Sequence, residues 1–563
     1  MTYLIETYGC QMNKAESAAL ESIFRERGWQ PAEPAPEAPR DSRIGALGES
    51  RSTLPLGNES YARDSHIGVL GESRSTLPLG NESYARDSHI GALGELRSTL
   101  PLGNESFARD SHIGVLGESR STLPLGNVDV VLINTCSVRA TAETRAWGRI
   151  DQFAAKKRAL AAAGKTPFAL VVTGCMAERM KRSIKQRQPA VDYVVGTFQK
   201  QAFGLVLDAV AQGRRLEEIE ESPAFVFAKS YYEPGSFRSF LPIMHGCDNY
   251  CSYCIVPYLR GHEVSRRPED ILAELDSLED AGVREITLLG QNVNSYMWKG
   301  GAGALGAAAP DAGLGSRSAI SGGTGLGPAS PSLDFPGLLR LISSHLGARG
   351  RGGIRWIRFL TSHPKDLSED LIRVLAEDRL FCRHVHLCVQ SGSDRILAAM
   401  NRRYSSSQYL DLVSRMRAAI PGLSLSTDIL VGFPGEREED NDATLALMAK
   451  VGFAYSFMYH FNPREGTPAA SLPERVAEKV KRERLAKVIA LQKLMSRELM
   501  QSRVGAEAEV LVEGLSRRKK SEVLGRTQAD EMVVFPAPAS RVGSFARVRL
   551  TGLSGNTFRA EEI

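Results

Sequence analysis

The sequence lacks several features that would narrow its class at once. Its 563 residues contain no apolar run long enough to span a membrane, and the opening residues MTYLIETYGC lack the basic and apolar regions of a secretory signal. The net charge is only +5, from 70 basic and 65 acidic residues, which is too small to indicate nucleic-acid binding by itself. These absences argue against a membrane protein, and we expect a cytoplasmic one.

Cysteine is also scarce, and its scarcity argues against a disulfide framework. The chain has 8 cysteines: Cys10, Cys136, Cys175, Cys247, Cys251, Cys254, Cys382 and Cys388. In a long chain without a secretory signal, such cysteines are more often free, metal-bound or catalytic than paired. Their positions along the chain therefore matter more than their number.

Composition and length fit a globular protein of several domains. Hydrophobic residues make up 42% and charged residues 24%, which is ordinary for a globular protein. A chain of 563 residues has room for three or four domains.

Two segments are predicted to be insertions. The sequence DSRIGALGESRSTLPLGNESYAR begins at Asp41 and recurs from Asp64 and Asp87, and a truncated copy runs from Asp110 to Asn127. A solenoid repeat is one interpretation, but the copies are rich in Gly, Ser and Pro and poor in apolar residues, which favours a flexible insertion. A Gly/Ala/Ser-rich stretch at 300–332 is predicted to be a second flexible loop.

The region around the first insertion predicts an open parallel α/β sheet. Four apolar runs predict strands: YLIETYGC, VDVVLINTC, FALVVTGC and VDYVVGT. The run NKAESAALESIFRERGW predicts a helix after the first strand, with Asn13 as its N-cap and Glu16 completing a capping box. Without residues 31–127, the chain would form a compact β-α-β unit.

The central and C-terminal regions predict two further folds. Six strand candidates alternate with helical patterns between Phe237 and Asn462: FLPIMHG, EITLLGQNV, WIRFLTSH, HVHLCVQSG, LSTDILVGF and AYSFMYHF. Six such units indicate a parallel barrel or partial barrel. A long charged helix is predicted for residues 473–501, and short strands broken by Gly from Val504 to Ile563 predict a small β-barrel.

Three cysteines that are far apart in sequence are predicted to meet. Cys10, Cys136 and Cys175 each end a predicted parallel strand, in the contexts YGC, NTC and TGC. Because ligands bind at the carboxyl ends of strands in open α/β sheets, these thiols can converge on one crevice. Metal ligation is favoured over three unrelated buried cysteines.

Three other cysteines lie close together at the end of the first barrel strand. HGCDNYCSYC places Cys247, Cys251 and Cys254 at the spacing C-x3-C-x2-C, on the face where barrel enzymes hold their active sites. A closed zinc site would need a fourth ligand, for which His245 or His262 is available. A four-iron cluster held by three thiolates would instead keep one iron open for chemistry.

The C-x3-C-x2-C spacing, with Tyr253 before its last cysteine, resembles the radical S-adenosylmethionine signature. Outside the insertions, the chain resembles the methylthiotransferases, which have an N-terminal cluster domain, a radical barrel and a C-terminal RNA-binding TRAM domain. TYGCQMNKAES, LLGQNVNSY, FLTSHPKDL, STDILVGFPGE and REGTPAA resemble the branch that modifies isopentenyl-adenosine in tRNA. Two other branches act on threonylcarbamoyl-adenosine in tRNA or on a ribosomal protein aspartate, and both stay as alternatives.

The resemblance implies a fold, a reaction and its cofactors. It implies an N-terminal methylthiotransferase domain at 1–213 with the insertion 41–127, a (β/α)6 partial TIM barrel at 233–500 with the insertion 300–332, and an OB-like TRAM barrel at 503–563. The reaction would convert N6-isopentenyl(dimethylallyl)adenosine at position 37 of tRNA to its 2-methylthio form. Two [4Fe-4S] clusters, on the two cysteine trios, and two S-adenosylmethionine molecules per turnover would serve it.

Further residues follow from the resemblance and from their place at strand ends. Those expected to line the cofactor and substrate pocket are Tyr253, Gly290, Gln291, Asn292, Gln390, Ser391, Gly392 and Gly432. Glycines at strand ends can equally make turns only. Arg260 and Arg266 could contact a phosphate or the cofactor carboxylate, or be solvated surface residues. Cys382 and Cys388 are interpreted as structural.

The expected partner is tRNA, gripped near its anticodon loop. The RRKK run in the C-terminal domain, together with a nearby arginine, gives phosphate-binding candidates Arg517, Arg518, Lys519, Lys520 and Arg526. We also expect a cytosolic one-electron donor, a monomeric state and no membrane partner. A non-catalytic RNA-binding protein with structural metal is the alternative from another class.

Overall fold

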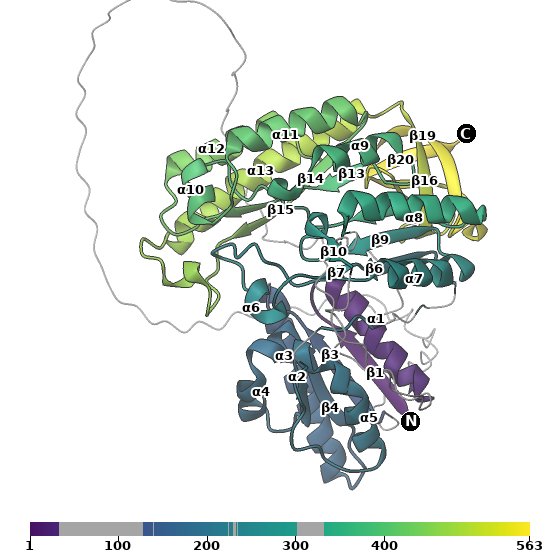
Figure 1. The fold of residues 1–563 in the computed structure, drawn as a ribbon, viewed down its shortest axis with the longest axis vertical. Helices are drawn as coiled ribbons and strands as arrows, with labels where there is room; N and C mark the ends of the chain where they lie inside the picture. Colours follow the sequence, from purple (N-terminus) through teal and green to yellow (C-terminus); the bar gives the residue numbers. More distant parts are fainter. Residues whose placement is uncertain (33–127, 139, 223–224, 229–231, 233–234, 301–331) are drawn as a thin grey trace, which may run out of the picture. The chain divides into compact units, whose positions relative to one another are not determined.

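A computed structural model describes residues 1–32, 128–138, 140–222, 225–228, 232, 235–300 and 332–563 (Figure 1). The tandem repeat at 41–127 and residues 301–331 of the second insertion lie outside the described residues, so their expected flexibility stays a prediction.

An open parallel sheet forms the N-terminal part of the chain, as the sequence predicts. Its strands lie in the order β2-β1-β3-β4-β5, and all neighbouring pairs are parallel. The strands are β1 (Thr2–Thr7), β2 (Gln30–Pro31), β3 (Val130–Thr135), β4 (Ala169–Gly174) and β5 (Tyr193–Val195). The helices are α1 (Gln11–Glu26), α2 (Ala140–Ala162), α3 (Cys175–Arg179), α4 (Lys181–Arg187) and α5 (Phe203–Ala211).

Helices cover both faces of this sheet because alternate strand residues are apolar on both sides. Val130 and Leu132 pack in one core cluster with residues of α1 and α5. Val131 and Ile133 pack in a second cluster with residues of α2, α3 and α4. A sheet buried on both faces therefore explains the continuous apolar strand that the sequence shows here.

The start of α1 differs from the prediction. The helix begins at Gln11 with Cys10 as its N-cap, so Asn13 is the third helical residue and not the cap. The Asn13 side chain instead accepts a hydrogen bond from the Cys10 backbone nitrogen at 3.3 Å. Glu16 is buried and pairs with Arg260 and Lys200, so it does not complete a capping box.

The central region contains all six predicted parallel strands. Two three-stranded sheets, β6-β9-β12 and β13-β14-β15, are linked by isolated parallel bridges such as Ile357 to Phe381. The strands are β6 (Arg238–Pro242), β9 (Glu285–Leu289), β12 (Trp356–Phe359), β13 (His384–His386), β14 (Ser424–Val431) and β15 (Tyr455–His460). This arrangement confirms the six-stranded partial barrel.

Helices alternate with these strands (Figure 1). Apolar residues of the strands and of most of these helices form the largest core cluster among the described residues. The helices are α6 (Val256–Arg260), α7 (Pro268–Asp280), α8 (Phe335–Arg349), α9 (Glu369–Glu377), α10 (Asp394–Ala399), α11 (Ser406–Ala419), α12 (Glu438–Val451) and α13 (Glu478–Ser502). Short strands β10 (Met297–Lys299) and β11 (Ser332–Asp334) pair at the base of the second insertion.

A small closed barrel forms the C-terminal part, with strand order β16-β17-β18-β20-β19. Its strands are β16 (Glu507–Leu515), β17 (Glu522–Thr527), β18 (Met532–Pro536), β19 (Phe545–Ser554) and β20 (Thr557–Glu562). The apolar runs AEAEVLVEG, EMVVFPA and FARVRLTG predict three of the five strands: β16, β18 and β19. β17 and β20 are not predicted, because their residues EVLGRT and TFRAEE contain few consecutive apolar positions.

A buried ion network joins the small barrel to the central strands. Arg358 on β12 pairs with Glu285 at 2.9 Å and donates to the backbone oxygen of Thr527 at 2.6 Å. The Trp356 ring lies 4.9 Å from Phe545 on β19. Polar and aromatic contacts therefore hold the two folds together.

In the described part of the chain, every helix is too short or too polar to cross a bilayer.

Candidate functional site

The sheet places Cys10, Cys136 and Cys175 at neighbouring strand ends. β3 lies between β1 and β4, and Thr135 at the end of β3 pairs with Gly174 at the end of β4. Cys136 and Cys175 directly follow these paired residues, and Cys10 follows β1 by three residues. The three cysteines therefore share one edge of the sheet, as the sequence predicts.

Two glycines allow neighbouring segments of the chain to pack closely at this edge of the sheet. A Cβ on Gly9 would lie 2.7 Å from the Cβ of Cys136, and a Cβ on Gly174 would lie 2.3 Å from the Thr135 carbonyl oxygen. Gly174 also has a φ of +94°, which disfavours any side chain. Small residues before Cys10 and Cys175 are thus required for the three thiols to approach one another.

Arg260 brings a positive charge to this cysteine trio. Its guanidinium donates to Cys175 Sγ at 3.3 Å and to Glu16 Oε1 at 2.7 Å. Burial raises the pKa of Cys175, and Arg260 acts in the opposite direction. Burial also acts to raise the pKa of Glu16, but Arg260 and Lys200 outweigh it and lower that pKa to about 2. The site thus favours negative charge on the Glu16 carboxylate, and Arg260 offsets part of the burial that disfavours a Cys175 thiolate.

The second trio lies on the loop between the short strand β7 (Met244–His245) and α6. Cys247, Cys251 and Cys254 fall within eight consecutive residues of this loop. The Cys254 backbone nitrogen donates to the Cys251 carbonyl at 2.9 Å, which tightens the loop. Ser252 fixes it to the end of α10, where its hydroxyl donates to the Ala399 carbonyl at 2.8 Å.

Burial holds two of these thiols in their neutral form when no cation is bound. It raises the pKa of Cys247 to about 11 and that of Cys254 to about 12. Such thiols need a positive partner to ionise, and a metal cluster supplies one. The donor set of both trios, sulfur only, fits iron–sulfur ligation.

Arg402 is a site residue that the sequence analysis missed. Buried at 5% exposure, it donates to Cys251 Sγ at 3.4 Å and to the Cys388 carbonyl at 2.6 Å. It follows α10 in the run MNRRY, where no motif spacing marks it. Only the fold brings the end of α10 to the cysteine loop.

Of the residues predicted at the end of β9, Gln291 contacts the cysteine loop directly. Its Oε1 accepts from the Gly246 nitrogen at 2.6 Å. Asn292 is buried and donates to Asp366 at 2.7 Å. A Cβ on Gly290 would lie 2.4 Å from Met244, so this glycine permits close packing.

The residues predicted at later strand ends have mainly packing contacts. Gly392 donates to the Thr444 hydroxyl at 3.0 Å, and Ser391 lies 3.3 Å from the same hydroxyl. Gln390 has a φ of +69° and its backbone bonds to β14. Gly432 has a φ of +72°, as a turn glycine does. Their role in ligand binding stays a prediction, as does that of Tyr253, which packs in the apolar cluster around Phe433.

The two histidines considered as zinc ligands have other partners. His245 is buried and stacks on Phe225 with ring centroids 3.5 Å apart. His262 lies at the surface, where Nδ1 is 2.7 Å from Asp248 Oδ1. These contacts do not favour a closed zinc knuckle on the barrel cysteines.

The structure narrows the interpretation of three arginines: burial removes the solvated alternative for Arg260 and Arg266, and Arg526 is paired with carboxylates. Arg260 is buried, as described above, and Arg266 is buried and pairs with Glu274 at 2.5 Å, so neither is a solvated surface residue. Arg526 bonds to Glu513 at 3.0 Å and to Asp530 at 2.8 Å, and its side chain is only 16% exposed. We therefore leave Arg526 out of the RNA-binding set, because two carboxylates already neutralise it.

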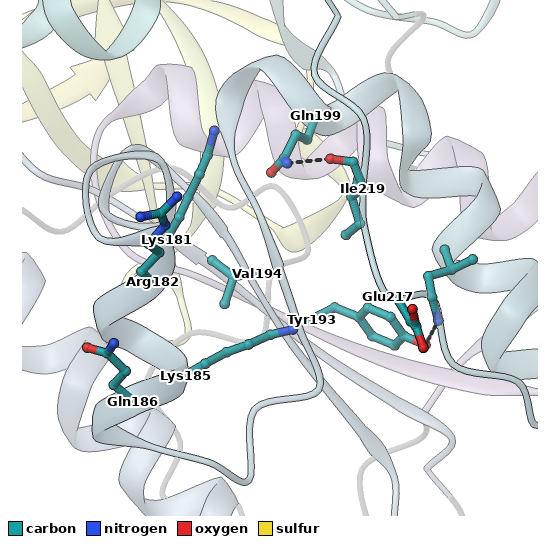
Figure 2. Close-up of a pocket in the computed structure, with 10 residues that line it drawn as sticks. Lys181, Arg182, Lys185, Gln186, Tyr193, Val194, Gln199, Glu217 and Ile219 are labelled. Carbon is teal, nitrogen blue, oxygen red and sulfur yellow. Dashed lines mark hydrogen bonds between the residues drawn. The ribbon is translucent and has the colours of Figure 1, made fainter.

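A pocket in the N-terminal part lies away from this chemistry (Figure 2). It lies between α4, which contributes Lys181, Arg182 and Lys185, and the strand that carries Tyr193 and Val194. Of the described residues that line it, none is one of the six cysteines.

Comparison with known proteins defines the class. Residues 241–448 match the Radical SAM superfamily, residues 116–196 match "Uncharacterized protein family UPF0004", and residues 501–562 match the TRAM domain. The chain is therefore a radical S-adenosylmethionine enzyme, a class that implies S-adenosylmethionine and a [4Fe-4S] cluster.

Full-length relatives define the family. The tRNA-2-methylthio-N(6)-dimethylallyladenosine synthase of Treponema denticola is 38% identical over 100% of this chain and 99% of its own. The synthase of the same name from Geobacter sulfurreducens is 40% identical over 77% of this chain and 89% of its own. The chain belongs to the family of tRNA-2-methylthio-N(6)-dimethylallyladenosine synthases.

Solved structures are more distant. The radical S-adenosylmethionine methyltransferase TsrM from Kitasatospora setae, with cobalamin and a [4Fe-4S] cluster bound, covers 61% of this chain and 66% of its own. The TM-score is 0.44 at 16% identity, which is too weak a likeness to support an inference about the site.

Proposed function

We propose that this enzyme methylthiolates C2 of N6-dimethylallyladenosine at position 37 of tRNA. The observation that carries the proposal is the pairing of two sulfur-only sites in one chain of this family. Cys10, Cys136 and Cys175 lie at one sheet edge, and Cys247, Cys251 and Cys254 lie on one barrel loop. A methylthio transfer needs both a source of sulfur and a means of activating a C–H bond, so two sites fit it better than one.

Each trio is proposed to hold a [4Fe-4S] cluster. When bound, the barrel cluster supplies the electron that cleaves S-adenosylmethionine reductively, and a second S-adenosylmethionine supplies the methyl group for sulfur at the N-terminal trio. Two molecules are therefore used per turnover. The thiol protons of the ligating cysteines are lost when the clusters are loaded, because thiolates are the ligands.

The chain's own residues orient these sites. Gln291 fixes the backbone before Cys247 through its bond to Gly246, and Arg402 directs a positive charge at Cys251. Arg260 does the same at Cys175. Hydrogen bonds to ligand sulfurs adjust the reduction potential of a cluster, so both arginines are positioned to do so.

We propose that the C-terminal barrel binds the tRNA and that the central barrel recognises the target adenosine. Arg517, Arg518, Lys519 and Lys520 are exposed on the loop between β16 and β17, as phosphate contacts require. The adenosine of the anticodon loop would leave its stack to reach the barrel pocket. We further propose that the enzyme is a monomer located in the cytoplasm. It would receive electrons from a cytosolic one-electron donor.

Nucleoside mass spectrometry of tRNA tests this function directly. The chain is expressed in a host that lacks its own methylthiotransferase, and tRNA is digested and analysed. We expect 2-methylthio-N6-dimethylallyladenosine to form, and we expect the Cys251→Ala variant to form none. The matched control is Cys382→Ala, another buried cysteine, which packs against Trp356 and Leu511 and should retain activity.

Two outcomes would contradict the proposal. Methylthiolation of threonylcarbamoyl-adenosine or of a ribosomal protein, with dimethylallyladenosine unchanged, would assign another acceptor. Iron and acid-labile sulfide well below about eight per chain in anaerobically reconstituted protein would show that two four-iron clusters are not present.

A further inference from the structure

A second kind of ligand set lies in the central barrel, apart from the six cysteines. Among the residues that the structure describes, His386, Cys388 and Asp428 bring one ligand atom each to within 4.8 Å of one another. His386 and Cys388 are buried, and Asp428 keeps 28% of its side chain exposed. The sequence analysis interpreted Cys388 as structural, but its thiol contacts a carboxylate.

The strand geometry explains why these residues meet. His386 ends β13, and Cys388 follows two residues later. His386 pairs in register with Ser426 on the parallel neighbour β14, and Asp428 lies two residues beyond Ser426. Since residues two apart point to the same face of a strand, the three side chains share one face.

The carboxylate contacts both the thiol and the imidazole, so the three groups do not form a proton relay. Cys388 Sγ lies 3.4 Å from Asp428 Oδ2, and His386 Nε2 lies 3.6 Å from the same oxygen. A nucleophilic triad needs the histidine between the nucleophile and the carboxylate. Here the carboxylate oxygen contacts both other groups, which is the arrangement that surrounds a common cation.

Ser426 orients the histidine from the other side. Its hydroxyl lies 2.9 Å from His386 Nδ1 and 2.9 Å from His384 Nε2. When the His384 ring carries its proton on Nδ1, its Nε2 can accept from the hydroxyl. The hydroxyl can then accept from His386 Nδ1–H, which leaves the Nε2 lone pair facing Cys388 and Asp428. Metal-binding histidines commonly have such a partner on the second nitrogen.

We propose that His386, Cys388 and Asp428 form a zinc-binding site with three protein ligands. A thiolate with an imidazole and one carboxylate oxygen is a soft to intermediate donor set, which favours zinc over magnesium or calcium. Three protein ligands leave a fourth position for water, and the partial exposure of Asp428 gives access to it. Arg402 contacts both the Cys388 carbonyl and Cys251 Sγ, so the site borders the barrel cysteine loop.

Metal analysis of the reconstituted holoenzyme tests the site. The protein is equilibrated with one equivalent of Zn²⁺, desalted, and analysed for zinc, iron and sulfide. We expect about one zinc per chain in the wild type and a loss of at least tenfold in Cys388→Ala, with iron and sulfide unchanged. The Cys382→Ala control, which alters a buried cysteine outside the trio, should retain zinc.

Zinc K-edge absorption on the wild type gives an answer even if Cys388→Ala does not fold. One sulfur at about 2.3 Å together with nitrogen and oxygen at about 2.0 to 2.2 Å would support the site. Zinc with three or four sulfur ligands would place it on the iron–sulfur cysteines and overturn the proposal. Absence of bound zinc in the wild type, or full retention in Cys388→Ala, would also overturn it.

Discussion

At the scale of single residues, Arg260 is a buried charge on which the stability of the folded protein is expected to depend. It lies at 4% exposure and satisfies Glu16 and Cys175, which come from different elements of the N-terminal sheet. Removal of one partner from a buried ion pair leaves an uncompensated charge, and that is costly.

We therefore expect Arg260→Leu to destabilise the protein by about 3–5 kcal/mol. Among the described residues, Glu16 would then keep Lys200, at 2.8 Å, as its ion-pair partner. The measurement is the urea midpoint of cluster-free protein followed by tryptophan fluorescence. Arg267→Leu is the control, since Arg267 is 62% exposed and its loss should cost no more than about 0.5 kcal/mol. Equal effects of the two variants would contradict this account.

The sequence could predict the grouping of the six cysteines but not which arginines contact them: Arg260 was expected to contact a phosphate or the cofactor, and Arg402 was not expected at all. The cysteines are marked by spacing and by their place at strand ends. Arg260 and Arg402 reach sulfur only because the loop after β6 packs against α1 and the end of α10. No local pattern encodes contacts between segments so far apart in the chain. The same reason explains why Arg526, which lies near the exposed basic run in sequence, is neutralised by Glu513 and Asp530 in the fold.

At the scale of elements, the basic loop between β16 and β17 is the segment that we propose to contact RNA. Its four cations are exposed, and Lys519 has a nearby carboxylate, Glu522, at 3.4 Å. Exposed cations contribute to RNA binding mainly by displacing counterions from phosphates, which makes the effect dependent on salt.

We expect replacement of all four loop cations by alanine to weaken tRNA binding several-fold at low salt. The slope of log affinity against log salt should fall by up to about one for each cation that neutralises a phosphate in the wild type. Binding is measured by filter retention across a salt series. A control variant removes four exposed cations elsewhere: Arg267, Arg351, Arg373 and Lys479. An equal weakening in the control would show that net charge alone matters.

Strands with consecutive apolar residues could be predicted from the sequence. Strands in which polar residues are frequent could not. All six central strands were predicted because each contains several consecutive apolar residues. β17 and β20 were missed because half of their residues are polar, and a five-stranded barrel buries only alternate positions. The cap of α1 was assigned to Asn13 because asparagine is a common cap, but the side chain caps from the third helical position.

At the scale of the whole molecule, the ion network around Glu285 joins the central strands to the C-terminal barrel. Glu285 pairs with Arg238 at 2.8 Å and with Arg358 at 2.9 Å, and Arg238 also reaches Glu513 at 2.6 Å. The C-terminal barrel is thus held to the catalytic one by charges whose ionisation can be changed by pH.

The pH dependence follows from the direction of the Glu285 shift. Burial acts to raise the pKa of Glu285, but Arg358 and Arg238 outweigh it, so the pKa lies below its ordinary value. A carboxyl group with a lower pKa in the folded state stabilises that state above its unfolded pKa of about 4.3. This stabilisation is lost as the pH falls from there through the folded pKa.

We therefore expect the urea midpoint of cluster-free protein to fall below about pH 4.3, and Glu285→Gln to show a shallower fall from a lower starting value. Loss of the carboxylate leaves Arg358 with the Thr527 and Gln528 carbonyls and with Asp530 at 3.9 Å, but without its shorter ion pair. The small barrel should therefore also become easier to cleave from the rest by limited proteolysis at pH 7. Glu483→Gln is the control, because Glu483 is 58% exposed and lies on the outer part of α13. If Glu285→Gln keeps the full acid transition of the wild type, then other carboxylates hold the two barrels together and the Glu285 network does not.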